Sequence, residues 1–295
     1  MTPLALAATH DLNRDLTIRV FTGDPEVPRV PLVGYHCRPG ERPYLHPVHA
    51  PGGGPVLTQD RPSDHPWQHG VFTGLHQVNG LDFWQEHRFP DRSGVVRFEH
   101  LGDLRGDGES ITWTGSSRWT SRADEPILHE TQRWTVRRGA AEWYPIDLEW
   151  TLRGLRDVSF GQHFCGGLAV RLVYNQAHEV LNAAGQDRAA APEQPAAWCD
   201  VSAPFDGSRG WTGEDITAGA WHGVALFDHP SNFRYPSRWR VDAQGLINPS
   251  PSLAGPWSLP EGKVTRFRYR LIVHTGKADR DLLAHLHADF ATAPA

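Results

Sequence analysis

The chain has 295 residues, a formal net charge of −5, and the composition of an ordinary globular protein, with 39% hydrophobic and 21% charged residues. Binding to a nucleic-acid backbone needs a basic stripe, which the sequence lacks, and no apolar run approaches the roughly 20 residues that span a bilayer. We therefore expect a small-molecule partner and neither nucleic acid nor a membrane.

The N-terminal segment and the cysteines bear on the compartment. A short apolar run from Leu4 to Ala8 has no basic residue before it and is a poor secretory signal. Cys37, Cys165 and Cys199 are odd in number and lack the CxxC spacing of structural zinc and redox motifs. Both features favour a reducing compartment, and we expect a cytoplasmic protein.

The content of proline, glycine and tryptophan predicts an all-β fold. Its 24 prolines and 29 glycines interrupt long helices, and its 12 tryptophans suit a pleated surface. We expect one large antiparallel β-sandwich domain over residues 1–295. Alternating or β-rich runs bounded by turn residues predict strands at residues 16–23, 94–104, 110–121, 127–139, 142–154, 222–230 and 264–276.

The C-terminal part of the chain shows three further patterns. Between residues 266 and 271, arginines alternate with Phe, Tyr and Leu, so one face of that strand is wet and the other packs. Residues 182–197 are rich in Ala, Pro and Gln and predict an exposed loop. Residues 277–293 carry leucines at helical spacing, with Asp279 as a candidate cap, and predict a short C-terminal helix.

Residues 46–87 concentrate polar side chains among turn residues and aromatics, and they hold six of the 17 histidines. In the string DHPWQHG, His65 and His69 are two alternations apart and can share a face of an extended segment. Asp64 can hold a neighbouring imidazole in one tautomer, which acid–base catalysis and metal ligation both require. The alternative is that these are loop histidines satisfied by backbone groups.

The string HQVNGLDFW follows directly. Asn79 and Gly80 predict a type I′ turn, and the resulting hairpin would return Trp84 to the neighbourhood of His76. An exposed indole stacks on the C–H face of a sugar, while His and Asn bind hydroxyl groups. The alternative is that Trp84 and Phe83 are core residues, which we favour for Phe83.

Two distant segments add candidates. The string FDHPSN repeats Asp-His-Pro. Loops at one edge of a sandwich can meet, so His229 and Asn232 could face His65 and His69. The alternative is that the string recurs by chance. QHFCGG contributes His163, for which a structural role is an equal alternative. We expect Cys165 to be a buried apolar thiol.

Cofactors are constrained by the motifs. The sequence has no P-loop, GxGxxG or GxSxG motif, so no nucleotide cofactor is expected. Imidazole and carboxylate groups suit one divalent metal ion such as Zn or Mn, although no spacing such as HExxH specifies its ligands. One bound divalent ion stays open as an alternative.

The strings RPYLHPV, DHPWQHG, VNGLDFW and FDHPSN resemble the bacterial family labelled "methane oxygenase PmoA-like", over roughly residues 40–275. The activity in that label requires transmembrane helices and is not expected here. The closing segment SLPEGKVTRFRYRLIVH is similar to the end of galactose-mutarotase-like supersandwich proteins. These resemblances imply a sugar-binding cleft on a large β-sandwich that uses His with a carboxylate. Proteins similar to this one accompany sugar oxidoreductases, which implies oxidised sugars or glycosides as substrates.

We therefore expect a carbohydrate lyase or hydrolase/hydratase acting on 3-keto sugars or glycosides. The C3 ketone acidifies the C2 proton, a histidine removes it, and a second acid protonates the leaving oxygen. The alternatives are an aldose mutarotase or epimerase, and a non-catalytic sugar-binding module that relies on tryptophans at positions 67, 84 and 257. The catalytic candidates are His65, His69, Asp64, His163 and His229, and the substrate-binding candidates are Arg61, His76, Asn79, Trp84, Asn232 and His46.

Overall fold

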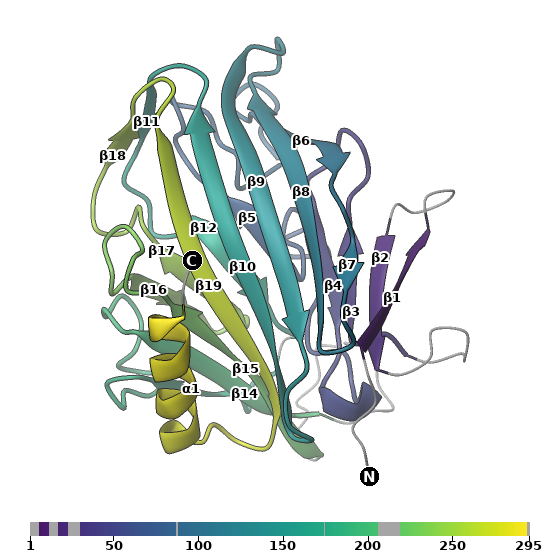
Figure 1. The fold of residues 1–295 in the computed structure, drawn as a ribbon. Helices are drawn as coiled ribbons and strands as arrows, with labels where there is room; N and C mark the ends of the chain where they lie inside the picture. Colours follow the sequence, from purple (N-terminus) through teal and green to yellow (C-terminus); the bar gives the residue numbers. More distant parts are fainter. Residues whose placement is uncertain are drawn as a thin grey trace.

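The structure is a computed structural model that describes residues 6–11, 17–22, 30–86, 88–173, 175–205 and 219–293. These residues form two large antiparallel β-sheets packed face to face, with one α-helix near the C-terminus (Figure 1). The elements are β1 (Leu6–Asp11), β2 (Thr17–Thr22), β3 (Val33–His36), β4 (Tyr44–Val48), the 3₁₀ turn η1 (Pro51–Gly53), β5 (Val71–Gly74), β6 (Val95–Leu101), β7 (Arg105–Gly106), β8 (Ser110–Thr120), β9 (Pro126–Arg137), β10 (Trp143–Gly154), β11 (Val158–Phe160), β12 (Gly167–Arg171), β13 (Glu179–Asn182), β14 (Trp198–Phe205), β15 (Ala220–Asp228), β16 (Arg238–Val241), β17 (Leu246–Ser250), β18 (Trp257–Leu259), β19 (Val264–Thr275) and α1 (Arg280–Thr292).

In the described residues, the first sheet has the order β1-β2-β3-β4-β5-β12-β17-β16. The second has the order β13-β14-β15-β19-β10-β9-β8-β6, with β7 paired to β8, and a short β11–β18 pair lies outside both sheets. All seven predicted strands are present, as β2, β6, β8, β9, β10, β15 and β19. The predicted all-β antiparallel fold with a C-terminal helix is therefore confirmed.

The long strands of the second sheet show why alternation identified them. On β19, Phe267, Tyr269 and Leu271 are buried between the sheets, and the arginines between them lie on the outer face. A buried carboxylate also joins the two sheets: Glu130 of β9 accepts hydrogen bonds from Thr73 Oγ1 of β5 (2.7 Å) and from Trp150 Nε1 (2.6 Å). A buried charge needs such donors to remain favourable.

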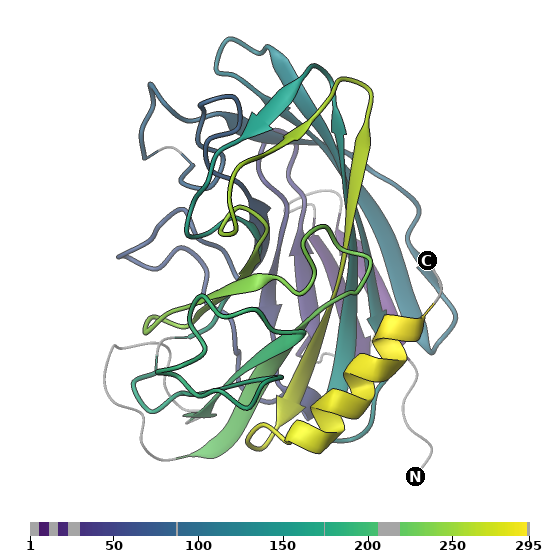
Figure 2. The same cartoon turned by 90° about the vertical axis from the view of Figure 1, so that its left-hand side faces the viewer.

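Apolar residues are also buried on the outer face of each sheet, under the helix on one and under loops on the other. On the second sheet, Phe227 and Ile272 pack under α1, whose first turn is capped by Asp279 accepting from the Leu282 amide at 3.0 Å. On the first sheet, Tyr44 and Phe72 belong to a second apolar cluster with Trp67 and Trp84 of the 60–92 loops. Figure 2 shows these blue loops projecting at the left and α1 lying at the right. The histidine-rich loops and the helix thus lie on opposite sides of the sandwich.

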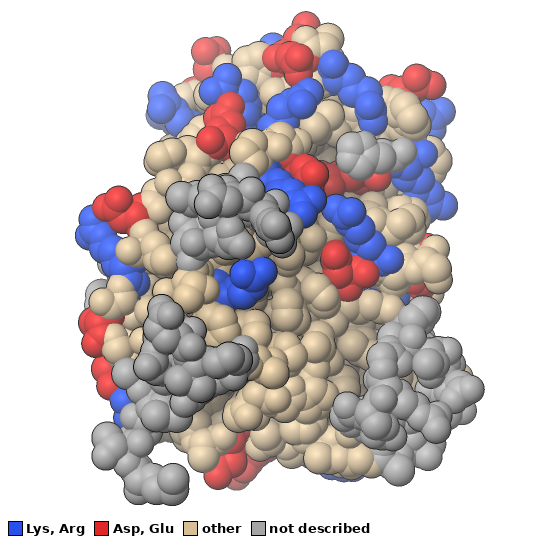
Figure 3. Space-filling view, turned by 90° about the vertical axis from the view of Figure 1, so that its right-hand side faces the viewer, with Lys and Arg blue, Asp and Glu red and all other residues tan. Residues whose placement is uncertain are grey.

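Three further features concern the loop between β13 and β14, the charged surface and the helical segments. Between β13 and β14, residues 184–190 are mostly exposed, whereas Ala191 and Ala196 are buried. On the side shown in Figure 3, acidic and basic side chains of the described residues are interspersed. None of the helical segments that the structure describes has the length and apolar character needed to cross a bilayer.

Candidate functional site

Two cavities lie among the loops that cover the first sheet. The His69 cavity, of about 580 Å³, is lined by Gly40, Glu41, Arg42, Arg61, Pro66, Trp67, His69, Glu86, Arg88, Val95 and Val96. The His163 cavity, of about 670 Å³, is lined by His76, Gln77, Gly80, Asp82, Gln85, Phe89, Arg92, Ser159, Phe160, Gly161, His163, Phe164, Pro256 and Trp257. Both volumes are in the range of small-molecule sites.

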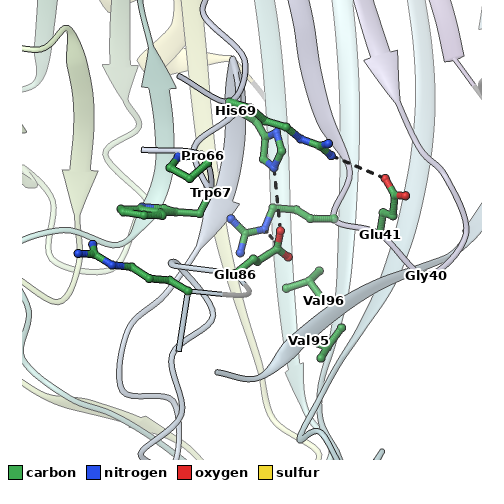
Figure 4. A pocket seen from close by; sticks show the side chains of 11 residues that line it. Gly40, Glu41, Pro66, Trp67, His69, Glu86, Val95 and Val96 are labelled. Carbon is green, nitrogen blue, oxygen red and sulfur yellow. Dashed lines mark ion pairs between the residues drawn. The ribbon is translucent and has the colours of Figure 1, made fainter. Parts of the chain in front are cut away.

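His69 is held between two carboxylates. Its Nδ1 lies 2.6 Å from Asp60 Oδ1, its Nε2 lies 4.0 Å from Glu86 Oε2, and its ring stacks on Tyr44 with centroids 4.1 Å apart. Figure 4 shows the imidazole directed at the Glu86 carboxylate. Burial opposes ionisation of Asp60, but the hydrogen bond and charge of His69 outweigh burial and hold the pKa of Asp60 below its usual value. Asp60 therefore stays ionised and fixes the orientation of the ring.

Arg42 positions the opposing carboxylate. It is buried, and its Nε forms an ion pair with Glu86 Oε1 at 3.1 Å. Its Nη atoms donate to the carbonyl oxygens of Phe83 and Trp84. Because all three contacts converge on residues 83–86, Arg42 holds the Glu86 carboxylate at a fixed place on the cavity wall.

The rim of the His69 cavity carries two further cations. The Arg61 side chain is largely exposed, with Nη2 4.0 Å from Glu41 Oε2 (Figure 4). The Arg88 guanidinium lies over the Trp67 ring at 4.4 Å. Trp67 is the indole that faces this cavity, although only 7% of its surface is exposed.

Asp64 holds a neighbouring imidazole, as predicted, and that imidazole belongs to His65. Asp64 contacts His65 Nδ1 at 3.0 Å, Arg171 Nη2 at 3.3 Å and Gln244 Nε2 at 3.0 Å, so it does not orient His69. Neither Asp64 nor His65 lines either of these two cavities. Because His65 lies outside both cavities, we assign it no role in catalysis.

The predicted hairpin is present. Asn79 and Gly80 both have positive φ, 49° and 81°, and the backbones of Val78 and Leu81 pair in both directions. Asn79 lines neither cavity, and its side-chain oxygen accepts from the Ser159 amide at 2.8 Å, which secures the hairpin to β11. We therefore assign Asn79 a structural role in place of the predicted role in substrate binding.

Trp84 returns to His76 as predicted, with ring centroids 5.8 Å apart, but it is not a stacking platform. Its ring is 2% exposed and also packs on Phe72 at 4.9 Å, so the core alternative is right for Trp84 as well as for Phe83. Phe72 and Trp84 lie between His69 and His76, so the His69 cavity and the His163 cavity are separate. His69 and His163 therefore cannot act as a pair on one bond.

His163 belongs to a second cluster. Cys165 Sγ lies 3.4 Å from His76 Nε2 and 3.5 Å from His163 Nδ1, and the two imidazole rings stack at 3.6 Å. Burial, with the nearby charge of His76, lowers the pKa of His163 to about 4, and burial raises the pKa of the Cys165 thiol. Cys165 is thus the buried thiol that we predicted.

The second Asp-His-Pro segment does not meet the first. Arg268 Nη1 of β19 lies 2.8 Å from His229 Nε2, and Phe290 of α1 packs edge-on against the His229 ring, so this residue lies on the opposite side of the sandwich. Asn232 donates to Asp228 Oδ1 at 2.7 Å. The recurrence is therefore structural, and the predicted roles of His229 and Asn232 in a shared pocket are wrong.

His46 lies on the same side of the sandwich as the cavities but lines neither of them. Its Nδ1 contacts Thr58 Oγ1 at 3.0 Å, and burial lowers its pKa to about 4. Three residues that line or support the His69 cavity were not singled out from the sequence: Asp60, Arg42 and Glu86. Asp60 and Glu86 lie in the histidine-rich stretch, but nothing local distinguishes Arg42.

The chain belongs to a family of unknown function, DUF6807, whose profile matches residues 25–288. The label "PmoA-like" expected from the motifs is not supported. No curated protein matches the sequence.

Several solved structures are similar in overall arrangement. Galactose 1-epimerase from Lactobacillus acidophilus NCFM is 9% identical, with 93% of this chain and 100% of that chain covered and a TM-score of 0.41. A galactose mutarotase related enzyme from Lactobacillus acidophilus is 9% identical, with coverages of 82% and 95% and a TM-score of 0.37. An aldose epimerase homologue from C. elegans is 12% identical, with coverages of 83% and 96% and a TM-score of 0.32. Likeness of this degree assigns no residue roles.

Proposed function

We propose that the chain is a carbohydrate-active enzyme that transfers protons between neighbouring positions of a sugar in the His69 cavity, most concretely a lyase that cleaves 3-keto glycosides. The observation that carries this proposal is the placement of His69 between Asp60 and Glu86. Trp67 and the charged lining support a sugar as ligand, because an indole stacks on C–H faces while charged groups bind hydroxyls.

We assign the two catalytic roles, base and acid, from the charged neighbours of Glu86 and His69. The Arg42 guanidinium forms an ion pair with Glu86, so we assign the Glu86 carboxylate as the base that removes the C2 proton. His69 has a carboxylate beside each ring nitrogen, Asp60 at Nδ1 and Glu86 at Nε2, so we assign its Nε2–H as the acid. This differs from the expectation that a histidine removes the C2 proton, and the reason is the Arg42 contact with Glu86.

The short separation favours elimination over direct hydrolysis. Hydrolysis by two carboxyl groups uses separations of about 5–5.5 Å with retention and about 6.5–9.5 Å with inversion. Glu86 Oε2 and His69 Nε2 are 4.0 Å apart, which suits atoms on adjacent carbons, such as the C2 proton and the glycosidic oxygen on C1.

The proposed elimination balances as follows. Glu86 takes the C2 proton, and the electron pair forms the enolate of the C3 ketone, whose negative charge Arg61 or Arg88 can stabilise. The enolate then reforms the ketone, a C1–C2 double bond forms, the C1–O bond breaks, and His69 Nε2–H protonates the leaving oxygen. Glu86 finally returns its proton to His69. Addition of water to the double bond by the reverse steps would complete a net hydrolysis.

An aldose mutarotase is the second candidate, because the same pair suits two oxygens bonded to one carbon. His69 would protonate the ring oxygen while Glu86 removes the proton from the C1 hydroxyl, so that the ring opens and recloses on either face. This reaction needs no ketone.

The test is a comparison of initial rates for Glu86→Gln and His69→Gln with the wild-type protein, on 3-keto glycosides and on plain aldoses. Loss of an acid–base group typically lowers turnover by about 100-fold to 10,000-fold. His65→Gln is the matched control, since His65 is a nearby histidine outside both cavities. Equal losses in His65→Gln and His69→Gln, or none in either, would refute the assignment.

A further inference from the structure

We propose that the His163 cavity holds a zinc ion bound by His76 Nε2, His163 Nδ1 and Cys165 Sγ, with a fourth position open to an oxygen ligand from the cavity. The three donor atoms lie within 4.8 Å of one another. They come from two segments 89 residues apart, which the fold brings together. This inference does not depend on the function proposed for the His69 cavity.

The two sulfur–nitrogen distances fit a tetrahedral zinc ion. Zinc–sulfur bonds of about 2.3 Å and zinc–nitrogen bonds of about 2.0–2.1 Å at tetrahedral angles separate sulfur from nitrogen by about 3.5 Å. The two observed separations from Cys165 Sγ are 3.4 Å and 3.5 Å. The imidazole rings are stacked with an interplanar angle of 25°, so they must tilt apart to aim both nitrogens at the metal.

Supporting contacts orient the ligands. Asp82 Oδ1 lies 3.2 Å from His76 Nδ1, so the Nδ1–H donates to Asp82 and the Nε2 lone pair faces Cys165. Asp82 is itself fixed by the backbone amides of Trp84 (2.7 Å) and Gln85 (3.0 Å). A carboxylate behind a ligating histidine is a recurrent feature of metal sites.

The cysteine side of the cluster is equally constrained. Asn248 accepts from the Gly166 amide at 2.9 Å and donates to the Gly166 and Leu168 carbonyl oxygens. Gly166 and Gly167 have φ values of 142° and 101°, which favour glycine. This turn holds Cys165 against the two histidines.

The donor atoms suit zinc, and the cavity gives room for a fourth ligand on the metal. One thiolate and two imidazoles suit zinc, whereas magnesium, calcium and manganese prefer oxygen donors. Three protein ligands leave a fourth position, as in catalytic rather than structural zinc sites. His76 and His163 line a cavity whose rim includes Phe89 and Phe164, 44% and 50% exposed. Exposed aromatic rings around a cavity point to a ligand with an apolar face.

The test uses full-length protein freed of metal with a chelator and titrated with Zn²⁺ and Co²⁺. We expect a single metal ion per chain, and for Co²⁺ a thiolate charge-transfer band with the strong visible bands of a tetrahedral site. Acetohydroxamate should shift the visible bands by occupying the open position. Absence of zinc binding, or a cobalt spectrum without the thiolate band, would overturn the proposal; unchanged visible bands would overturn the open position.

Variants assign the ligands. Cys165→Ser should remove the charge-transfer band, whereas Cys199→Ser should keep it, because Cys199 is an equally buried thiol on β14, outside the cluster. Asp82→Asn should weaken zinc binding by about 10-fold to 100-fold. Zinc affinity unchanged in both Cys165→Ser and Asp82→Asn would contradict the assignment. If Cys165→Ser does not fold, the wild-type cobalt spectrum and Asp82→Asn decide.

Discussion

Asp60 Oδ1 and His69 Nδ1 are 2.6 Å apart, and this contact directs the opposite edge of the imidazole at Glu86. The orienting carboxylate thus precedes its histidine by nine residues. Asp64, five residues before His69, orients His65 instead.

Replacing Asp60 with Asn should lower turnover strongly while changing KM little. The amide cannot stabilise a positive charge on His69 and permits the wrong tautomer, and a comparable loss in hydrolytic triads costs about 10,000-fold in turnover. Asp64→Asn, which disturbs the neighbouring pair outside the cavity, is the control. Steady-state kinetics of the two variants decide: similar losses in both would show that Asp60 has no special role.

Replacing Arg42 with Met should destabilise the protein and also reduce turnover. It leaves the Glu86 carboxylate and two carbonyl oxygens without their donor, and breaking a buried ion pair typically costs about 3–5 kcal/mol. Urea unfolding measures this loss. Arg61→Met, at an exposed arginine of the same cavity, should leave the free energy of unfolding within about 0.5 kcal/mol of wild type. If both variants are equally stable, Arg42 does not hold the loop.

The two tryptophans should respond differently to replacement by Ala. Trp67 faces the His69 cavity, so Trp67→Ala should raise KM for the substrate of this site. Trp84 is enclosed by Phe72 and His76, so Trp84→Ala should cost about 3–5 kcal/mol of stability. Chemical denaturation and steady-state kinetics on both variants test the contrast, and a larger KM effect from Trp84→Ala with no loss of stability would reverse the assignment.

Stability should decrease as the pH falls from about 6.5 to 4. Burial lowers the pKa of His46, His163 and His229 to about 4, so in this window the unfolded chain takes up protons that the folded protein does not. Asp228 acts in the opposite direction, since burial raises its pKa to about 6 and its neutral form adds stability as the pH falls. The pKa is also lowered for His178, His222 and His287, so the histidines outnumber this carboxyl and the net effect is a loss of stability.

The free energy of urea unfolding between pH 7 and pH 4.5 measures this dependence. His46→Gln removes one of these histidines and should flatten the curve. A wild-type protein that becomes more stable on acidification would contradict the pKa directions.

The sheets differ in how much of them could be predicted. Strands of the second sheet such as β8 and β19 alternate, because much of their outer face meets water. Strands β5, β12 and β17 are buried along their whole length, packed by the core on one face and by the loop cluster on the other. They therefore carry no alternation, and the sequence patterns did not indicate β5 or β17.

The amino-acid composition indicates where in the sequence the site lies, but not which residues contact one another in it. Histidine density identified the stretch that contains His69 and Glu86, yet the choice between Asp60 and Asp64 depends on how the loop turns. Distant contacts such as Arg42 with Glu86 and His76 with Cys165 arise only when the strands pair. For the same reason the repeated Asp-His-Pro string was misleading, since recurrence says nothing about which side of a sandwich a loop occupies.

The most direct test of proton transfer by Glu86 and His69 is proton NMR in D₂O with 3-keto glycosides, unoxidised glycosides and aldoses. We predict loss of the C2 proton signal and release of the aglycone from the keto substrates alone, with both abolished in Glu86→Gln. Anomeric exchange of aldoses without C2 deuteration would instead support the mutarotase. No change in any sugar signal with the wild-type protein would contradict a catalytic role for the His69 cavity on these substrates.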